Sequence, residues 1–540
     1  MPESSSSSVS SSRFLLLDNV DPVCAKTLAE RGYEADQPSG WSEDDLKREI
    51  SKYAGLVVRS GTQVDEALLK HATHLQVIGR AGVGVDNIDL AAATTRGVLV
   101  MNTPDGNTIS TAEHTCGMIL SLARNIPEAV ARVKGGGWDR KAFMGSEVYG
   151  KTLGIIGLGK IGSEVARRMS AFGMTIVGFD PFATQEHADE YGIKLMSLEE
   201  VLGAADFLTV HTPLTDKTRG LISAKNKTLL KPGVRLVNCA RGGIITEMDL
   251  PELLDEGIVS GVALDVYSVE PPSDELREVL AHPAVVCTPH LGASTEEAQE
   301  KVAEQIAHQL ADAIENTSYK GSVNAKSVAL LANPDVKPFL VMAERLGAMC
   351  GQLIKEHAGD LQVEYTGQCA KFADLLTDGI LKGMLTPYIS GSVNLINART
   401  YANERGFSVS ETTTTAKGQY NDLLRVTLGE NDVYHRLTAT LFGGEDPRVV
   451  GIDNFQIELR LEGELLVYQN QDIPGMLASV SGALASREIN IGALSLGRSS
   501  KGERALTVLQ VDRALDDDDL GAIQGIDGIE NVHVCSLSRF

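Results

Sequence analysis

Length, composition and charge exclude several classes of protein. The chain has 540 residues, 43% of them hydrophobic and 22% charged, which is typical of a water-soluble protein with more than one core. The formal net charge of −23 argues against nucleic acid or acidic membranes as partners, because both need clustered lysine and arginine. No apolar run is long enough to span a bilayer. The seven scattered cysteines suit reduced thiols in the cytoplasm, so we expect neither disulfides nor a bound metal.

The chain begins with a Ser-rich segment, residues 1–12, that has neither an apolar core nor the arginines of a targeting peptide. We predict a disordered tail there. Short apolar runs separated by polar, helical stretches follow, and this alternation indicates a parallel sheet covered on both faces. The predicted strands are residues 14–17, 55–58, 75–78 and 98–101. A long helix is predicted to begin at Ser110.

A second series of strands and helices indicates a complete doubly wound domain. Its predicted strands are residues 152–156, 175–179, 207–210, 235–238, 262–266 and 285–288. A predicted helix over residues 295–315 leads back to the first sheet. We therefore expect a discontinuous first domain (13–110 and 295–322), with the second (111–294) inserted into it.

The last third of the chain has a different pattern of predicted helices and strands. Residues 323–460 mix a predicted helix (341–354) with short strands, which suggests an α+β domain without a chemical motif. Residues 464–540 show the order strand, helix, strand, strand, helix, strand, which is the ferredoxin-like pattern. The predicted fold class is therefore α/β, with two doubly wound domains followed by two α+β domains.

A glycine motif marks a dinucleotide site. Gly157, Gly159 and Gly162 form G-x-G-x-x-G between a predicted strand and a predicted helix over 163–172. Such glycines allow a tight turn, close approach of a pyrophosphate and close packing of the helix. Asp180 ends the next strand, and a carboxylate there accepts from a ribose hydroxyl and repels a 2′-phosphate. The pattern predicts NAD rather than NADP as cofactor.

Three later strands each end near a reactive group: Arg241, Glu270 and His290. Ligands in open α/β sheets bind at the carboxyl ends of the strands, so these groups should converge on the nicotinamide. Histidine serves as a general base, a carboxylate orients it, and arginine holds a substrate carboxylate. A lone histidine after a strand is more often structural, and Glu270 could be a turn acid. Their coincidence beside a nucleotide motif favours catalysis.

The chain resembles the D-2-isomer-specific 2-hydroxyacid dehydrogenases. The resemblance is carried by residues 157–162 (GLGKIG), 238–243 (NCARGG) and 289–292 (PHLG), and by Asp265 with Glu270. It implies that Arg241, Glu270 and His290 are catalytic. It also implies an NAD-binding set consisting of Gly157, Gly159, Lys160, Ile161, Gly162, Asp180, Thr212, Pro213, Cys239, Ala240, Arg241, Asp265, His290 and Gly292.

Further segments are similar to the long-form branch of that family that acts on 3-phosphoglycerate. They are residues 57–60 (VVRS), 79–82 (GRAG), 101–104 (MNTP) and 138–141 (WDRK). This similarity implies a substrate set of Arg59, Ser60, Arg80, Gly82, Asn102, Arg140 and Lys141. The cations would form a basic pocket within an acidic protein; alternatively, Arg140 and Lys141 are surface charges. Val83 departs from members that carry threonine beside the nicotinamide.

The terminal module is similar to an ACT domain, which implies regulation. Asp472 and Asn490 would then bind L-serine as an inhibitor where two modules meet, or would only cap local turns. Trp138, in a Gly-rich segment, suggests an anchor in a partner subunit of a homotetramer, although packing within its own subunit remains an alternative. Residues 323–460 are either an allosteric substrate-binding site or a spacer.

Two other functions remain open at this point. One is a reductase for glyoxylate, hydroxypyruvate or another 2-keto acid. The other is a non-catalytic, NAD-sensing corepressor with the same catalytic residues. The basic segments and the terminal module count against the reductase. The terminal module and the absence of a nuclear-type basic run favour an enzyme over the corepressor.

Overall fold

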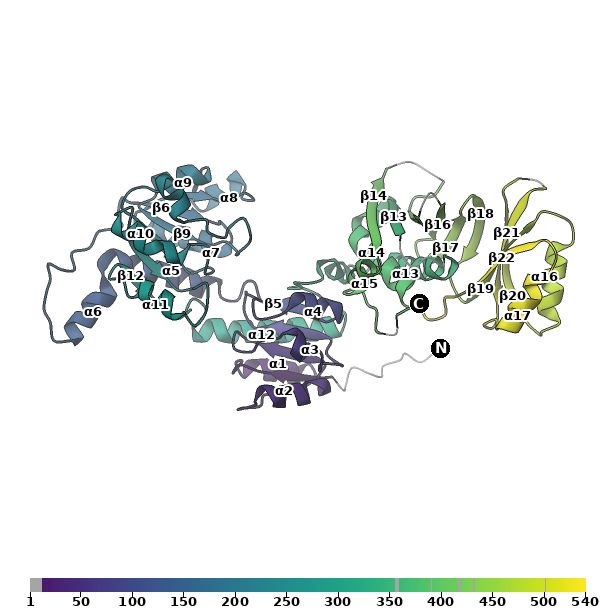
Figure 1. Cartoon of the computed structure of the whole chain (residues 1–540), viewed down its shortest axis with the longest axis horizontal. Coiled ribbons are helices and arrows are strands. Elements are labelled where there is room, and N and C mark those ends of the chain that lie inside the picture. The colour runs from purple at the N-terminus through teal and green to yellow at the C-terminus, as the bar shows by residue number, and fades with distance from the viewer. Residues whose placement is uncertain (1–11, 355–358, 390, 416–418, 431–432, 501) are drawn as a thin grey trace.

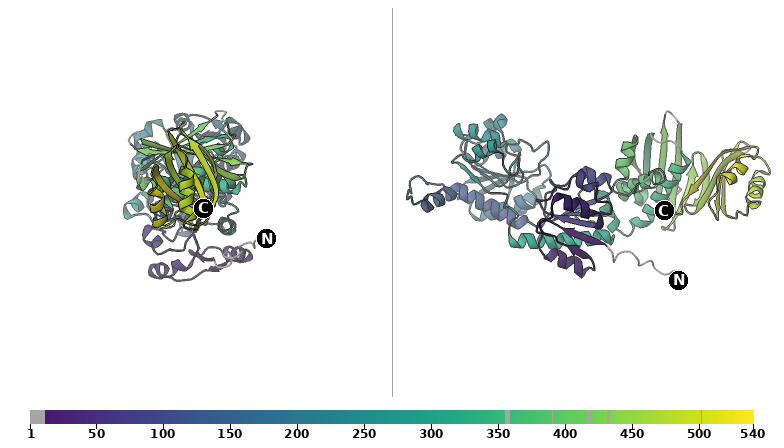
Figure 2. Two further views of the ribbon diagram at one scale, coloured as in Figure 1. Left: turned by 90° about the vertical axis from the view of Figure 1, so that its right-hand side faces the viewer. Right: turned by 60° about the horizontal axis from the view of Figure 1, so that its bottom comes forward.

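A computed structural model describes residues 12–354, 359–389, 391–415, 419–430, 433–500 and 502–540. Its four sheets lie along an elongated molecule, with the sheet of residues 152–287 at one end and the sheet of residues 464–536 at the other (Figure 1). Two further views show the same order (Figure 2). The tail predicted over 1–12 lies, up to residue 11, outside the described residues. Within the described ranges, no helix has the length and apolar character needed to cross a membrane.

The first sheet has five parallel strands in the order β2-β1-β3-β4-β5. The strands are β1 (Arg13–Leu16), β2 (Glu34–Asp36), β3 (Gly55–Val58), β4 (Val77–Arg80) and β5 (Leu99–Asn102). The helices between them are α1 (Val23–Glu30), α2 (Glu43–Glu49), α3 (Glu66–Leu69) and α4 (Leu90–Thr95). Helix α12 (Glu296–Ile314) returns to this sheet and packs closely on β4. A β-carbon added to Gly79 would stand 2.6 Å from Cγ1 of Ile306.

The second sheet has seven parallel strands in the order β12-β11-β10-β9-β6-β7-β8. They are β6 (Thr152–Ile156), β7 (Thr175–Phe179), β8 (Lys194–Leu195), β9 (Phe207–Val210), β10 (Val234–Asn238), β11 (Val259–Leu264) and β12 (Val285–Cys287). The helices are α5 (Thr108–Arg124), α6 (Ile126–Lys134), α7 (Lys160–Ala171), α8 (Gln185–Glu190), α9 (Leu198–Ala204), α10 (Leu250–Asp255) and α11 (Asp274–Leu280). The strand order reverses at β6 and β9, which places the ligand crevice at their carboxyl ends.

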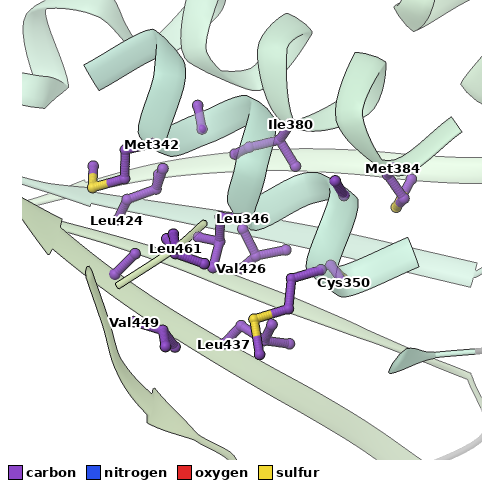
Figure 3. Packing of buried hydrophobic residues seen from close by; sticks show 14 of the residues in the cluster. Met342, Leu346, Cys350, Ile380, Met384, Leu424, Val426, Leu437, Val449 and Leu461 are labelled. Atoms are coloured by element: carbon purple, nitrogen blue, oxygen red, sulfur yellow. The ribbon is translucent and has the colours of Figure 1, made fainter. Parts of the chain in front are cut away.

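The third sheet has six strands in the order β14-β13-β15-β16-β17-β18, parallel only between β13 and β14. They are β13 (Gly359–Thr366), β14 (Phe407–Thr414), β15 (Leu423–Glu430), β16 (Val433–Phe442), β17 (Asp446–Ile452) and β18 (Phe455–Arg460). Helices α13 (Val336–Leu353), α14 (Ala373–Leu385) and α15 (Ala398–Glu404) accompany it. Residues of α13 such as Met342 and Leu346 pack between α14 and the sheet (Figure 3).

The terminal sheet has the antiparallel order β20-β21-β19-β22. Along the chain the elements are β19 (Glu464–Gln471), α16 (Met476–Ala485), β20 (Ile491–Arg498), β21 (Arg504–Val511), α17 (Asp517–Gln524) and β22 (Ile529–Ser536). This confirms the ferredoxin-like order of strand, helix, strand, strand, helix, strand. One face packs on the two helices and the other joins the core of the third sheet. Helical periodicity predicts that Leu477, Val480 and Leu484 form the buried face of α16. This is correct for Val480 and Leu484 and wrong for Leu477, which is exposed while Met476 is buried.

Candidate active site

The turn after β6 has the shape of a phosphate-binding turn. Gly157 has a φ of 95°, in the left-handed region that favours glycine. A β-carbon at Gly162 would lie 2.1 Å from the Gly157 carbonyl oxygen, so the first turn of α7 presses against this loop. In contrast, a β-carbon at Gly159 would meet nothing within 4 Å. The space over Gly159, at the N-terminus of α7, therefore suits a pyrophosphate.

Groups around this turn fit the rest of a dinucleotide. Asp180 accepts hydrogen bonds from the Leu158 N–H at 2.9 Å and the Phe182 N–H at 2.8 Å, and each carboxylate oxygen keeps a further acceptor position for a ribose hydroxyl. Among the described residues, the buried Thr212 hydroxyl has no hydrogen-bond partner, which leaves it able to bond to a ligand. Lys160 and Ile161 open α7, and Lys160 forms an ion pair with Asp105 of the first domain.

Asp265 anchors the loop that carries His290. It accepts from the Thr288 hydroxyl at 2.6 Å, the Leu291 N–H at 2.7 Å and the Gly292 N–H at 2.9 Å. Burial alone would raise the pKa of Asp265, but its partners, which include His114 at 3.1 Å, lower it overall. The sequence interpretation missed Thr288 and His114, because neither belongs to a recognisable motif.

The donor atoms of His114, Cys239 and Asp265 lie within 4.8 Å of one another. Burial raises the pKa of Cys239 to about 12, so without a metal its sulfur is a neutral thiol. The Asp265 oxygens are also engaged by hydrogen-bond donors. Cys239 is buried and the neighbouring Ala240 half-buried, while Pro213 is exposed next to the half-buried Thr212.

The three predicted catalytic residues come together, and Glu270 and His290 form a direct pair. His290 Nδ1 lies 2.8 Å from Glu270 Oε2, and Glu270 Oε1 accepts from the Tyr267 N–H at 3.0 Å. The hydrogen bond to Glu270 raises the pKa of His290. Burial raises the pKa of Glu270, but its bonds to His290 and Tyr267 outweigh burial, and the net shift is downward. This leaves His290 Nε2 to face a substrate.

Arg241 reaches across to the first domain. Its Nε lies 3.2 Å from Asp86 Oδ2, and a β-carbon at Gly84 would stand 2.3 Å from its Nη2. The side chain of Asp86 is 79% exposed, so this ion pair is weak and open to solvent.

Arg80 lies within a cluster of positive charge. Burial lowers its pKa to about 10, with further lowering by Arg59 and Arg241 that Asp86 and Asp18 only partly oppose. The buried Arg80 Nε has no hydrogen-bond partner within the described part of the chain. The charges of Arg59 and Arg241 thus act on Arg80, and such an arrangement suits an anion.

The remaining substrate residues divide into two groups. Gly82 has a φ of 147°, and a β-carbon there would stand 1.8 Å from Arg80 Nη1, so glycine is needed for the arginine to take this position. Asn102 donates to the Val83 carbonyl at 2.6 Å, and Ser60 is exposed. Arg140 and Lys141 are also exposed, but their segment follows α6 at the far end of the nucleotide-binding domain, away from the first sheet (Figures 1 and 2).

The two predicted regulatory residues lie apart within one chain. Asp472 accepts from the Gly502 N–H at 2.9 Å and pairs with Arg498 at 3.1 Å. Asn490 donates to Asp512 at 2.9 Å. Because Gln471 pairs with Arg504 and Ile491 with Val511, the two residues stand at opposite ends of β21, roughly 20 Å apart at the rise of a strand. A shared ligand would therefore require a second copy of the chain.

Two family models match the chain. Residues 116–292 match the NAD-binding domain of the D-isomer specific 2-hydroxyacid dehydrogenases, and residues 335–453 match the D-3-phosphoglycerate dehydrogenase intervening domain. The D-3-phosphoglycerate dehydrogenase of Bacillus subtilis is 42% identical over 91% of this chain and 94% of its own length. That of Methanocaldococcus jannaschii is 37% identical over 97% and 100%, and that of Homo sapiens 40% over 91% and 93%.

Solved structures resemble the first two domains. The TT0316 protein from Thermus thermophilus is 32% identical, with a TM-score of 0.51, over 58% of this chain and 99% of that one. The pyruvate reductase of Chlamydomonas reinhardtii is 26% identical, with a TM-score of 0.53, over 57% of this chain and 97% of that one.

Proposed function

The chain belongs to the D-3-phosphoglycerate dehydrogenase family, and on that premise we propose how its residues carry out and control the reaction. The protein is an NAD-dependent dehydrogenase that oxidises 3-phosphoglycerate to 3-phosphohydroxypyruvate, the first step of L-serine biosynthesis. The relatives give no support to the two alternatives, a glyoxylate or hydroxypyruvate reductase and a non-catalytic NAD sensor.

We propose that His290 is the general base and that Glu270 and Arg241 support it. His290 Nε2 takes the proton of the substrate hydroxyl, while Glu270, bound at Nδ1, orients the ring and stabilises its charged form. Arg241 exchanges Asp86 for the substrate carboxylate and polarises the reacting oxygen. The turn of Gly157, Gly159 and Gly162 would hold NAD, which when bound would supply the hydride acceptor.

The proposal depends most on one observation: His290 Nδ1 lies 2.8 Å from Glu270 Oε2. The charge of Arg241 acts on both His290 and Arg80, and that of Arg59 also acts on Arg80. A base next to an anion site suits a hydroxy acid with two negative groups. We propose that Arg59 and Arg80 hold the anionic groups of 3-phosphoglycerate, with Ser60, Gly82 and Asn102 shaping the pocket.

The test compares Arg59→Gln on two substrates. A charge-assisted hydrogen bond contributes about 1.5–3 kcal/mol, so kcat/KM for 3-phosphoglycerate should fall about 10- to 100-fold, and that for D-glycerate much less. Arg48→Gln, on the exposed face of α2, is the matched control and should change neither. Equal losses on both substrates would mean that Arg59 does not recognise the phosphate.

We propose a homotetramer with two kinds of contact. Helix α6 has no buried residue, and the segment after it exposes Trp138 to 79% and Met144 to 81%. Large exposed apolar side chains of this kind mark an interface. A partner subunit that covers α6 and the segment after it would also bring Arg140 and Lys141 to a neighbouring active site. Leu477 and Leu494 are exposed in the terminal module and suggest the second contact.

We propose that L-serine binds where two terminal modules meet, with Asp472 accepting from its ammonium group and Asn490 contacting its carboxylate or hydroxyl. The ion pair with Arg498 and the bond to Asp512 would have to open. Residues 323–460 would transmit the signal as an intervening, substrate-binding-like domain. If millimolar serine neither inhibits nor binds by calorimetry, this regulatory part fails and the catalytic part stands.

We also propose a cytoplasmic location, since all seven cysteines are free thiols.

A further inference from the structure

A buried carboxylate outside the sites described so far connects two catalytic loops. Glu247 begins the short helix η4 (Glu247–Asp249) that follows the Arg241 loop, and it is only 4% exposed. Its Oε1 atom accepts from the Gly243 N–H at 3.0 Å and from the Ser268 N–H at 3.0 Å. A buried carboxylate is costly unless it is hydrogen-bonded. A single oxygen atom therefore bridges the loops that follow β10 and β11.

Both loops carry catalytic side chains a short distance from the bridge. Gly243 lies two residues after Arg241, and Ser268 lies two residues before Glu270. The backbones touch between them: a β-carbon at Gly242 would stand 1.9 Å from the Tyr267 carbonyl carbon and 2.3 Å from the Ser268 nitrogen. No other residue type fits at Gly242, so the loops are held in direct contact.

The third catalytic loop is joined to the same junction through Tyr267. The Tyr267 N–H donates to Glu270 Oε1 at 3.0 Å, and the Tyr267 hydroxyl donates to the Thr288 carbonyl at 2.7 Å. Thr288 lies two residues before His290. Movement of Ser268 would therefore reach Glu270 and, through the Glu270–His290 bond, the base itself.

We propose that Glu247 is a positioning residue, which fixes the Arg241 loop against the loop of Glu270 and so sets the place of the substrate carboxylate relative to the base. It touches neither substrate nor cofactor and acts through two backbone N–H groups. The inference rests on the catalytic roles proposed above. A misplacement of about 1 Å between such groups costs up to about 100-fold in rate.

The experiment compares Glu247→Gln, which keeps an oxygen acceptor of the same reach, with Glu247→Met, which keeps the volume and loses the acceptor. Asp249→Ala is the matched control, because Asp249 lies on the same helix and accepts from the Ala224 N–H at 2.8 Å, away from the catalytic loops. Kinetics with 3-phosphoglycerate and NAD are measured as functions of pH, and Tm is measured for each variant.

We expect Glu247→Met to lower kcat/KM about 10- to 100-fold and to raise KM for 3-phosphoglycerate more than KM for NAD. It should also move the rising limb of the pH profile to lower pH, because a displaced Glu270 supports the charge on His290 less, leaving Asp265 and Arg241 as its charged neighbours. Glu247→Gln should restore both properties. Asp249→Ala should lower Tm without moving the pH profile.

Three results would overturn the proposal. One is a Glu247→Met enzyme whose Tm falls but whose pH profile and KM values match the wild type. Another is a Glu247→Gln enzyme as impaired as Glu247→Met, since the acceptor would then not be the cause. If Glu247→Met does not fold, Glu247→Asp, shorter by one methylene, must move the pH profile, and an unmoved profile counts against the proposal. A wild type without turnover would instead contradict the catalytic proposal.

Discussion

Alanine substitutions at two glycines of the phosphate turn should have opposite consequences. In Gly162→Ala the new methyl would lie 2.1 Å from the Gly157 carbonyl oxygen. A comfortable contact is about 3.5 Å, so α7 and the turn must separate by more than about 1 Å. Overpacking of this kind costs about 1–3 kcal/mol, which corresponds to a fall of roughly 2–10 °C in the Tm of the nucleotide-binding domain.

Gly159→Ala should leave the ligand-free protein unchanged. A β-carbon there meets nothing within 4 Å, and the φ of −67° suits alanine. The methyl would, however, occupy the space that we assign to the pyrophosphate. We expect the Kd for NAD to rise about 10-fold or more, equivalent to at least about 1.4 kcal/mol.

Calorimetry of the ligand-free variants and titration with NAD separate the two effects. Gly162→Ala should lower both Tm and NAD affinity, and Gly159→Ala should lower affinity alone. If Gly159→Ala binds NAD as tightly as the wild type, the pyrophosphate does not lie over this turn and the reasoning is refuted.

The remaining predictions concern the base and the ribose. His290→Ala should lower kcat about 10²- to 10⁴-fold with little change in NAD affinity; a near wild-type kcat would remove His290 from the mechanism. The Glu270 carboxylate raises the pKa of His290, and oxidation needs the neutral imidazole, so kcat/KM rises as pH increases through that pKa. Glu270→Gln lowers that pKa and should move the rising limb to lower pH; an unmoved limb would show that another group titrates. Asp180→Ala should weaken NAD binding and relax the rejection of NADP, which a wild type that already prefers NADP would contradict.

The sequence predicted the buried strands well and the edge strands poorly. The predicted ranges for β6, β7 and β9 match the structure, because central parallel strands are continuously apolar. Strands β2 and β8 were missed, since they are short, polar edge strands of three and two residues. In α16, Val480 and Leu484 are buried as predicted, but Met476 takes the place predicted for Leu477, which lies at the edge of that helix face and is 38% exposed.

The catalytic residues could be predicted because each follows a strand whose carboxyl end lies at one edge of the sheet. Glu247 could not, since its role depends on two loops that meet through backbone atoms, and no side-chain pattern records such a contact. Arg140 and Lys141 also show this limit. Sequence similarity places them in the substrate set, but the tertiary structure puts their segment, which follows α6, away from the first sheet (Figure 1).

Steady-state turnover tests the central claim most directly. Purified protein is supplied with NAD and either 3-phosphoglycerate or D-glycerate, and NADH formation is followed. The account predicts turnover of 3-phosphoglycerate with a kcat/KM at least about 100-fold above that of D-glycerate, because more than one charged contact of about 1.5–3 kcal/mol distinguishes the two. Rapid reduction of glyoxylate or hydroxypyruvate without oxidation of 3-phosphoglycerate, or NAD binding without turnover of any hydroxy acid, would contradict it.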